Sequence, residues 1–182
     1  GGMRGAFFPS IVVSGKQFFM VWQGKGEDFS DELFFMKSSN YGSTWSMRKR
    51  ITSSPGNNTA PSMAIHDSTL YVVYQNNDEK NWSIRMIRGI DRGWSWDDKP
   101  LTVSTTEANC YSPSVGSAGG DVMVLWYDTR ERGTRIYSRK YSPRDRAFQD
   151  EAEISEARYE SRNPVVVSIG RRCIVFWEER NV

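Results

Sequence analysis

The chain has 182 residues, a length that fits one domain with enough residues for a sizeable core. Its 24 Lys and Arg residues and 22 Asp and Glu residues leave a net charge of +2, which is too small for a general binder of nucleic acid or of an anionic membrane surface. The mean hydropathy is −0.61, no apolar run approaches the roughly 20 residues of a membrane span, and no signal peptide opens the sequence. We therefore expect a globular domain with no nucleic-acid partner and no membrane insertion.

Metal and cofactor chemistry find little support in the residue types. Cys110 and Cys173 are too few for a disulfide framework or a four-thiolate zinc site, and their positions leave open whether they pair. His66 is the single histidine, which excludes a multi-histidine metal centre and, unless His66 itself serves, the histidine-dependent forms of Ser or Cys catalysis. The chain contains no glycine-rich phosphate loop and no cofactor fingerprint. We expect neither a metal nor a cofactor.

An internal repeat organises the chain. Four prolines, each followed by a short apolar run, lie 52, 52 and 51 residues apart: Pro9, Pro61, Pro113 and Pro164. Four apolar segments that end in an aromatic residue follow the same period: 18–22, 70–74, 122–126 and 173–177. Since two registers share one period, we predict a single domain over 1–182 with repeats at 5–58, 59–110, 111–161 and, incomplete, 162–182.

Each repeat holds about four short apolar segments separated by turn-forming residues, a pattern typical of strands. The second segment is continuously apolar, so we expect four such strands near the inner side of a ring, with buried middle residues. The third segment alternates, as Leu33, Phe35 and Lys37 show. Asp150–Glu156 has the propensity of a helix, but it aligns with Arg50–Thr52 of the first repeat, and we predict an outer strand there.

Four strands per repeat at a period near 50 residues predict an all-β fold, a β-propeller of four-stranded antiparallel blades, with about three and a half blades in this chain. A β-sandwich is the competing fold, but it does not explain why whole four-strand units recur. Propellers close with roughly four to eight blades, and an open ring exposes strand edges and apolar faces. We therefore expect missing blades in a larger chain, or self-association.

The turn between the third and fourth segments carries a recognisable motif. Residues 38–45 read SSNYGSTW and residues 89–96 read GIDRGWSW, at the same offset within the repeat. Both resemble the Asp-box, the S-x-D-x-G-x-T-W signature of BNR repeats in sialidases (the neuraminidase superfamily). Residues 141–148 keep only the final aromatic. The matched positions are Ser38, Asn40, Gly42, Thr44, Trp45, Asp91, Gly93, Ser95 and Trp96.

The Asp-box is a turn rather than a catalytic site. A short Asp or Asn side chain can hydrogen-bond nearby backbone groups, and Gly42 and Gly93 supply positive φ without a Cβ penalty. Trp45 and Trp96 are then expected as largely buried plugs between neighbouring sheets. The resemblance implies that these loops lie at the periphery, away from the ligand-binding face. It also favours a secreted or cell-surface location.

The resemblance sets a demanding test for catalysis. Sialidases use three arginines against the substrate carboxylate, a tyrosine nucleophile paired with a glutamate, and an aspartate acid/base. The first arginine stands in an F/Y-R-I/L-P motif, and neither Phe7–Pro9 nor Tyr111–Pro113 carries it. We therefore expect a sialidase-like propeller that recognises a glycan or a protein without complete catalytic machinery. The alternatives are part of an exo-sialidase that cleaves terminal sialic acid, and a purely architectural repeat.

Polar residues follow the second strand in every repeat, at the place where a propeller ligand would bind. Asp128 is the one weak catalytic candidate, since the family's acid/base can lie just past this strand, although its pairing with Arg130 favours a structural role. No residue is predicted as catalytic with more support than this. The ligand-binding candidates are Asp128, Arg130, Glu178 and Arg180.

Overall fold

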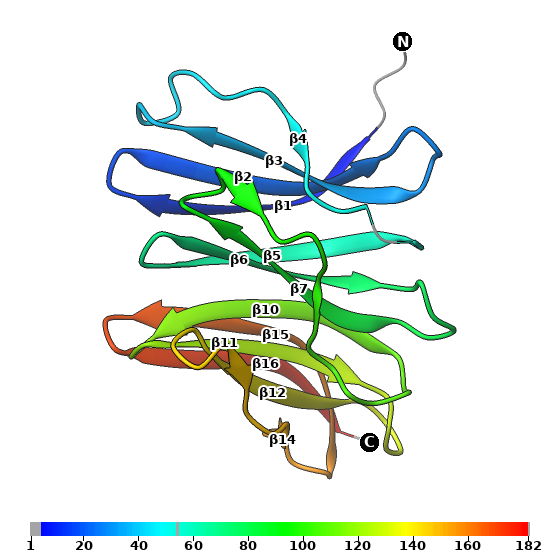
Figure 1. The fold of residues 1–182 in the computed structure, drawn as a ribbon. Coiled ribbons are helices and arrows are strands. Elements are labelled where there is room, and N and C mark those ends of the chain that lie inside the picture. The colour runs from blue at the N-terminus through cyan, green and yellow to red at the C-terminus, as the bar shows by residue number, and fades with distance from the viewer. Residues whose placement is uncertain (1–4, 54, 182) are drawn as a thin grey trace.

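The turn-separated apolar segments form strands throughout the chain. The computed structural model describes residues 5–53 and 55–181, and this part of the chain is all-β (Figure 1). The ends of the predicted domain, 1–4 and 182, lie outside it, as does residue 54. Over the same residues, no helix of a length and apolarity that could cross a membrane is present.

The strands group into four antiparallel sheets. Sheet 1 contains β1 (Ala6–Ser14), β2 (Gln17–Lys25), β3 (Asp31–Ser38) and β4 (Lys49–Arg50). Sheet 2 contains β5 (Asn58–His66), β6 (Thr69–Asn76), β7 (Ser83–Ile90), β8 (Ser95–Trp96) and β9 (Leu101–Thr102). Sheet 3 contains β10 (Cys110–Ala118), β11 (Asp121–Asp128), β12 (Arg135–Ser142), β13 (Ala147–Phe148) and β14 (Ala152–Glu153). Sheet 4 contains β15 (Tyr159–Ile169) and β16 (Arg172–Asn181).

The outer edge of each larger sheet is built from two-residue strands. The segment 150–156 contributes β14, which pairs with β12 through Tyr137 and Glu153. The predicted strand is therefore confirmed against the helical propensity of this segment. One serine or threonine hydroxyl docks each outer segment on its third strand: the amides of Leu33, Ile84 and Ile136 each donate over 2.9 Å to Thr52, Ser104 and Ser155, respectively.

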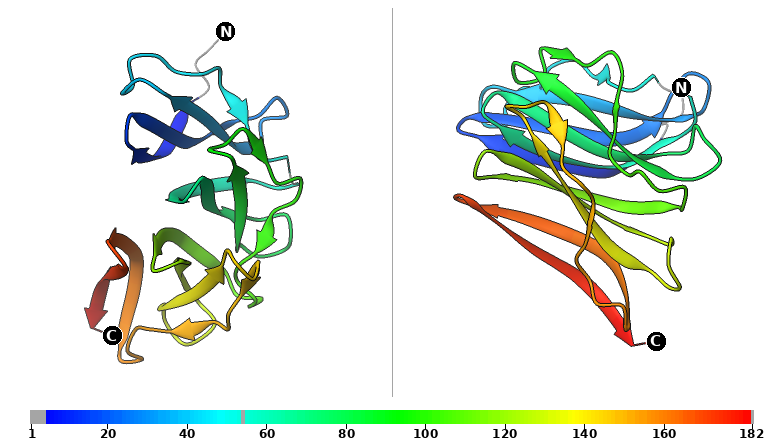
Figure 2. Two further views of the ribbon diagram at one scale, coloured as in Figure 1. Left: turned by 60° about the vertical axis from the view of Figure 1, so that its left-hand side comes forward. Right: turned by 60° about the horizontal axis from the view of Figure 1, so that its bottom comes forward.

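The four sheets follow one another along an arc, with sheet 1 and sheet 4 at its two ends (Figure 2). Their first strands pack in succession, β1 on β5, β5 on β10 and β10 on β15. The first strand therefore forms the inner edge, and the second strand lies one position further out, between the first and third strands. The second strands therefore lie near the inner side of the arc, as predicted, with the first strands forming the edge itself.

The repeated prolines mark a bulge at this inner edge. In each first strand the pairing register shifts across two residues, the second of which is the proline. A proline has no amide hydrogen to give to the ladder, so it sits where pairing is interrupted. The preceding residue has a φ between 49° and 51° in all four strands: Phe8, Ala60, Ser112 and Asn163.

The serine that follows three of these prolines links its sheet to the next one. The hydroxyl oxygens of Ser10, Ser62 and Ser114 accept hydrogen bonds of 3.0–3.2 Å from backbone amides of the following sheet, namely those of Met63, Val115 and Val166. In sheet 4 the equivalent residue is Val165, which has no such acceptor. Each Pro-Ser pair of the sequence thus marks a bulge at the inner edge, and its serine accepts a hydrogen bond from the next sheet.

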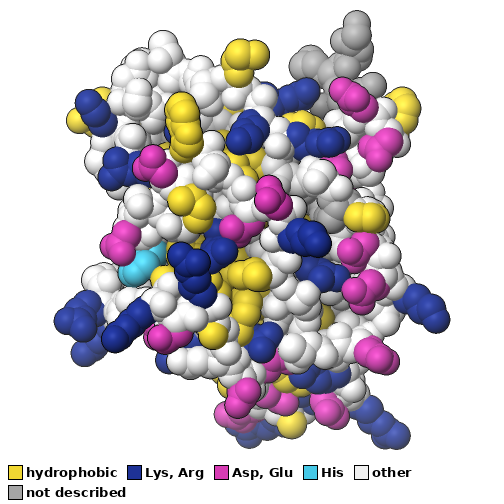
Figure 3. Space-filling view, in the orientation of Figure 1, with side chains coloured by type: hydrophobic (Ala, Val, Ile, Leu, Met, Phe, Trp, Pro, Cys, Tyr) yellow, Lys and Arg dark blue, Asp and Glu magenta, His cyan; other side chains and the backbone are white. Residues whose placement is uncertain are grey.

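Second strands are buried where a sheet lies on both sides of them. Their side chains enter two cores, one between sheets 1 and 2 around Phe19 and Val72, and one between sheets 2 and 3 around Val124. In β16 the prediction of burial is wrong, because Ile174 and Phe176 are 43% and 58% exposed. Sheet 4 has only β15 and β16, and this face of β16 has no sheet packed on it among the described residues. On the surface drawn in Figure 3, acidic and basic side chains are interspersed, with apolar ones between them.

Candidate functional site

The predicted site residues lie at two opposite ends of the sheets. The loops after the second strands, together with the starts of the first strands, form one end, and Asp128 and Glu178 lie there. The turns after the third strands, which carry the two Asp-box motifs, form the other end. The antiparallel hairpin order alone imposes this separation, because consecutive turns alternate between the ends of a sheet.

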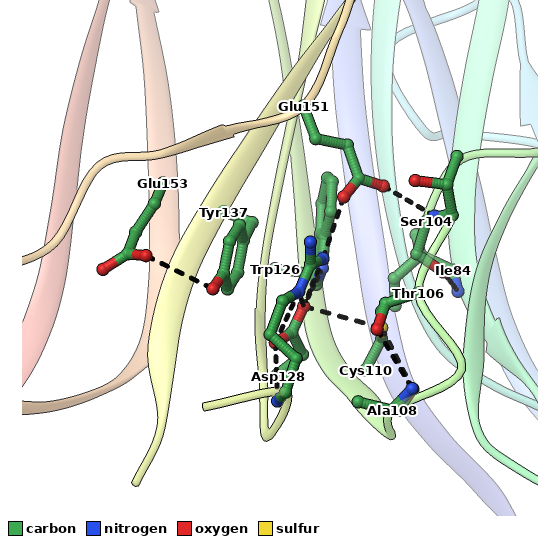
Figure 4. A network of polar contacts seen from close by, with 12 residues as sticks. Ile84, Ser104, Thr106, Ala108, Cys110, Trp126, Asp128, Tyr137, Glu151 and Glu153 are labelled. Atoms are coloured by element: carbon green, nitrogen blue, oxygen red, sulfur yellow. Dashed lines mark hydrogen bonds and ion pairs between the residues drawn. The ribbon is translucent and has the colours of Figure 1, made fainter. Parts of the chain in front are cut away.

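Asp128 is enclosed by hydrogen bonds and has an exposed fraction of 0% (Figure 4). Trp126 Nε1 donates to Asp128 Oδ2 over 3.1 Å, and Arg130 Nη2 donates to the same oxygen over 2.7 Å. The backbone amide of Arg130 donates to Oδ1 over 3.1 Å. A buried carboxylate with both oxygens occupied braces its loop and presents no open side to a ligand.

Arg130 extends this bond network to the neighbouring sheet. Its Nη2 also donates to Glu151 Oε2 over 2.8 Å, and Glu151 Oε1 accepts the Thr105 amide over 2.6 Å from the connection that leaves sheet 2 (Figure 4). Its guanidinium carbon lies 3.8 Å from the ring centroid of Tyr137. Burial alone would lower the pKa of Arg130, but the hydrogen bonds with Asp128 and Glu151 raise it above its ordinary value. The predicted Asp128–Arg130 pair thus ties sheet 3 to sheet 2.

Two further groups of this network are kept neutral by burial. Burial raises the pKa of the Cys110 thiol to about 12, and its Sγ lies 4.0 Å from Asp128 Oδ2. Burial and the nearby Asp128 charge raise the pKa of Tyr137 to about 12. A neutral buried thiol is a poor nucleophile. Cys110 and Cys173 are both free, which answers the question of their pairing.

Sheet 4 repeats the Asp128 arrangement at Glu179, one residue after the predicted candidate Glu178, and the 51-residue period from Asp128 does point to Glu179. Trp177 Nε1 donates to Glu179 Oε1 over 2.8 Å, as Trp126 does to Asp128. Glu179 also pairs across the sheet with Ser161, the equivalent of Cys110. Glu179 is therefore the counterpart of Asp128, and Glu178 is the counterpart of Tyr127, whose side chain lies on the opposite face of the sheet.

Glu178 belongs to a polar group at the inner edge. Asn163 Nδ2 donates to Glu178 Oε2 over 3.1 Å, and Ser112 Oγ donates to Asn163 Oδ1 over 3.2 Å. The Ser112 amide in turn donates to Gln75 Oε1 over 2.8 Å. These contacts join sheets 2, 3 and 4 beside the bulges. Arg180, the other sheet-4 candidate, is exposed and pairs in the ladder with Glu160.

A hollow of about 370 Å³ lies where the four bulges converge. We call it the axial hollow, and its lining is Phe8, Pro9, Ala60, Pro61, Ser112, Pro113, Ser114, Asn163, Pro164 and Val165. Each sheet contributes both residues of its own bulge pair, so the hollow is a product of the repeat. Its lining is apolar at Phe8, Ala60, Val165 and the four prolines, and the Ser112–Asn163–Glu178 contacts supply polar groups at sheets 3 and 4.

Arg162 stands beside this hollow and was missed by sequence reasoning. It lies two residues before Pro164 on the first strand β15, and its side chain is 51% exposed. Its Nε donates to Thr134 Oγ1 over 3.3 Å, and its Nη2 lies 3.5 Å from Glu160 Oε2. The repeat register carries the signal that could have found it, because Phe7, Thr59 and Tyr111 occupy the same position in the other sheets. An exposed guanidinium can hold a carboxylate by two hydrogen bonds.

The first Asp-box turn closes on itself. Asn40 Oδ1 accepts from the Thr44 amide over 2.9 Å and from Ser38 Oγ over 2.9 Å, and Asn40 Nδ2 donates to Thr44 Oγ1 over 2.9 Å. Ser38 Oγ accepts the Gly42 amide over 2.9 Å, and Trp45 Nε1 donates to the Gly42 carbonyl over 3.0 Å. Every side chain of this set is used within the turn.

The second turn matches in sequence but not in bonding. Asp91 and Gly93 both have positive φ, and the carboxylate of Asp91 has no hydrogen-bond partner in the described part of the chain. Gly93 is buried, and a Cβ there would lie 2.7 Å from the Phe35 ring of sheet 1. Trp96 meets the same ring at 5.0 Å between centroids.

The two tryptophans are half-buried, which is less than predicted. Trp96 does lie between sheets, against the core shared by sheets 1 and 2. Trp45 packs within its own turn instead, 3.9 Å from the Cβ position of Gly42. The difference arises because sheet 1 precedes sheet 2 and packs against Trp96, whereas no sheet of the described chain precedes sheet 1.

Comparisons with known proteins agree on fold only. No protein-family model and no curated protein matches the sequence. A protein of unknown function from Dyadobacter fermentans matches in structure with a TM-score of 0.71, 16% identity, and coverage of 96% of this chain and 62% of that one. A thermostable family-43 glycoside hydrolase matches with a TM-score of 0.66, 10% identity, and coverage of 96% and 65%.

A Trypanosoma rangeli sialidase, solved with 2,3-difluorosialic acid, matches with a TM-score of 0.66, 15% identity, and coverage of 97% of this chain and 34% of the sialidase. The chain thus spans less than two thirds of the length of each of these three structures. Sialidases and family-43 hydrolases are propellers, and the identities are low enough that the likeness concerns the fold alone. The chain has an all-β propeller fold built from antiparallel sheets.

Proposed function

We propose that this chain is a glycan-binding part of a sialidase-like propeller, with the axial hollow as its binding site. The observation that carries the proposal is the convergence of four bulges on one hollow of about 370 Å³ with polar groups along one side. This volume falls within the roughly 300–1,000 Å³ of small-molecule sites. Phe8, which is 61% exposed at the rim, offers an apolar face to a sugar ring.

The neighbours in structure support a sugar ligand. The sialidase of Trypanosoma rangeli was solved with a sialic acid analogue, and the family-43 protein is itself a glycoside hydrolase. Sugars need hydrogen-bond donors and acceptors together with apolar contact, and the axial hollow offers both kinds of group. A polyanion would need a surface of one charge sign, whereas Figure 3 shows the two signs mixed on the face that it presents.

Binding without hydrolysis is favoured by the carboxylates. Glycoside hydrolysis commonly uses two carboxyl groups roughly 5–10 Å apart on either side of the scissile bond. None of the residues lining the axial hollow is acidic, and Glu178 beside it is bonded to Asn163. Asp128 is fully buried within the Arg130 network. We infer that the catalytic set is incomplete in this chain.

Arg162 favours a second candidate, a part of an exo-sialidase. It precedes Pro164 on a first strand, where the resembled family places the first of its substrate-binding arginines. Its side chain is 51% exposed, and the next residue, Asn163, lines the axial hollow. In this case the chain would supply one carboxylate-binding arginine, and the nucleophile and acid/base would come from elsewhere.

The test is binding of defined oligosaccharides, measured by calorimetry and by saturation-transfer NMR. The probes are 3′-sialyllactose and arabinohexaose. We expect Asn163→Ala and Phe8→Ala each to weaken binding at least tenfold, because each removes one side of the axial hollow. The matched controls are Asn81→Ala and Phe29→Ala, at exposed residues outside the hollow. A loss specific to sialyllactose in Arg162→Ala would favour the second candidate. Equal binding by the wild type and all five variants would contradict the assignment of the hollow.

A further inference from the structure

Two apolar faces at the ends of the arc continue the internal packing of the propeller. We call the face that packs on the preceding sheet the leading face, and the face that packs on the following sheet the trailing face. Within the chain, the trailing face of each of sheets 1, 2 and 3 packs on the leading face of the next sheet, which gives three such contacts. The leading face of sheet 1 contains Ile11, Val13, Phe18, Met20 and Trp22. The trailing face of sheet 4 contains Val165, Val167, Ile169, Ile174 and Phe176.

Both faces are open in the described chain. Ile11 and Val13 on the first face are each 54% exposed. On the second face, Ile169 and Phe176 are each 58% exposed, and Val165 is 51% exposed. Exposed apolar area of this kind on one side of a sheet is unusual for an isolated surface and marks a contact.

The repeat identifies which residues would meet if these two faces packed together. Between sheets 2 and 3, Ser62 Oγ accepts the Val115 amide over 3.2 Å, and His66 Nδ1 lies 3.0 Å from Ser117 Oγ. In the repeat, Val165 of sheet 4 is equivalent to Ser62 and Ile11 of sheet 1 is equivalent to Val115, so Val165 would meet Ile11. Likewise Ile169 is equivalent to His66 and Val13 to Ser117, so Ile169 would meet Val13.

These pairs are matched in polarity. The His66–Ser117 contact joins two polar side chains, whereas both members of the equivalent pair, Ile169 and Val13, are aliphatic. At the bulge, Val165 replaces the hydroxyl acceptor with a methyl group that can contact Ile11. Both end faces therefore present aliphatic side chains at the positions that would meet.

We propose that the trailing face of sheet 4 binds the leading face of sheet 1 of a second copy of this chain. The contact joins two different surfaces, so the association is head-to-tail rather than symmetric, and it closes into a ring or extends according to the angle between copies. Continuity with the three internal sheet contacts argues for a second copy, because the second copy carries the surface that this packing requires.

The experiment places a charged residue on one of the two end faces at a time. Wild-type chain, Phe176→Glu and Ile11→Glu are measured by light scattering after size exclusion and by sedimentation velocity over a range of concentrations. We expect the wild type to exceed the 20.9 kDa of one chain by a factor of two or more, and each variant alone to be a monomer. An equimolar mixture of the two variants retains one intact face of each kind and should form a dimer. Met47→Glu, at a residue 92% exposed elsewhere, should behave as the wild type does.

Each other result overturns the proposal. A monomeric wild type at the highest concentration would leave these faces to further sheets of a longer chain or to a different protein. Self-association of either single variant would indicate contact between two like faces. If a charged variant loses its circular dichroism spectrum, a cross-linking experiment tests the head-to-tail contact instead. It mixes Val13→Cys chains with Ile169→Cys chains, both carrying Cys173→Ser, and measures disulfide formation between them. Cross-links are expected in the mixture, and their absence there, or their presence in either chain alone, would contradict the head-to-tail contact.

Discussion

At the scale of single residues, burial separates acidic side chains that look alike in the sequence. Asp128 ends the second strand of its sheet, Glu178 lies near the end of the second strand of sheet 4, and each has an arginine two residues later. Asp128 has no exposed area and four nitrogen donors around it (Trp126 Nε1 and the backbone N, Nε and Nη2 of Arg130), whereas Glu178 is exposed beside the axial hollow. A side chain with all its oxygens occupied contributes to stability, and an exposed one is free to meet a ligand.

Removing the Asp128 carboxylate should therefore destabilise the protein. Asp128→Ala leaves the partly buried Arg130 guanidinium against Tyr137 with Glu151 as its remaining carboxylate partner, and the loss of one partner of a buried ion pair costs about 3–5 kcal/mol. The measurement is the free energy of unfolding in urea. Glu156→Ala is the matched control, since Glu156 and Arg158 form an exposed pair of the same spacing, worth about 0–1 kcal/mol. Equal losses in the two variants would contradict the structural role of Asp128.

Glu32 should make stability depend on pH in a distinctive direction. It is 3% exposed, burial raises its pKa above the ordinary 4.5, and Thr52 and Asn58 (Nδ2, 3.1 Å) donate to its Oε2. A folded-state pKa above the unfolded value means that the native state binds the proton more tightly. This contribution to the unfolding free energy is thus present at low pH and is lost as pH rises from about 4.5 through the folded pKa.

The comparison that isolates this effect is with Glu32→Gln. We expect the stability of the wild type relative to this variant to fall as pH is raised from 4 to 7, in urea titrations at each pH. Glu27→Gln, at an exposed glutamate of the β2–β3 loop, serves as the control. A relative stability that rises with pH would show that the hydrogen bonds from Thr52 and Asn58 outweigh burial.

At the scale of elements, two turns with similar letters are held by different forces. The turn of sheet 1 is closed by the side chains of Ser38 and Asn40, whereas the turn of sheet 2 relies on positive φ and on Gly93 against Phe35. The Asp-box pattern therefore predicts a turn in both places but not the interactions that stabilise it.

Substitutions at the equivalent positions should expose this difference. Asn40→Ala removes three hydrogen bonds of the first turn and should cost about 1–2 kcal/mol. Asp91→Ala, at the equivalent residue of the second turn, should change the unfolding free energy by no more than about 0.5 kcal/mol. Chemical denaturation of both variants is the measurement. A larger loss for Asp91→Ala than for Asn40→Ala would reverse the assignment.

At the scale of the whole molecule, the arc of sheets brings together groups from four repeats but places no pair of free carboxylates at the axial hollow. Hydrolysis needs an acid and a base or nucleophile in reach of one bond, and the closest acidic residue with a catalytic resemblance, Asp128, is enclosed.

We therefore expect this chain to show no turnover of a fluorogenic sialoside. The assay compares the chain with buffer and with an active sialidase, and it includes Asp128→Asn and Arg162→Ala. The proposal of binding without hydrolysis would fail if the chain released the fluorophore and either variant abolished that release. Loss in Asp128→Asn alone, with unchanged thermal stability, would identify Asp128 as the acid/base.

Much of the fold could be predicted from the sequence because four copies of one repeat can be aligned with each other. The spacing of the prolines locates the first strands, and the apolar runs locate the second strands. Alignment between repeats also corrected a local propensity, since 150–156 pairs as a strand. The pattern of a repeat thus determines which segments pair, since every unit must bury the same face.

The tertiary structure alone decided which residues are available for function. The prediction named Glu178, whereas the structure places Glu179 in the position of Asp128, and a shift of one residue moves a side chain to the other face of the sheet. The axial hollow is likewise invisible in the sequence, because its lining comes from residues about 51–52 positions apart. The sequence by itself determined the strands and their repeat, through local apolar pattern and turn chemistry. Only the packing of sheets decided burial, partnership and exposure, because these depend on what the neighbouring sheet places against each face.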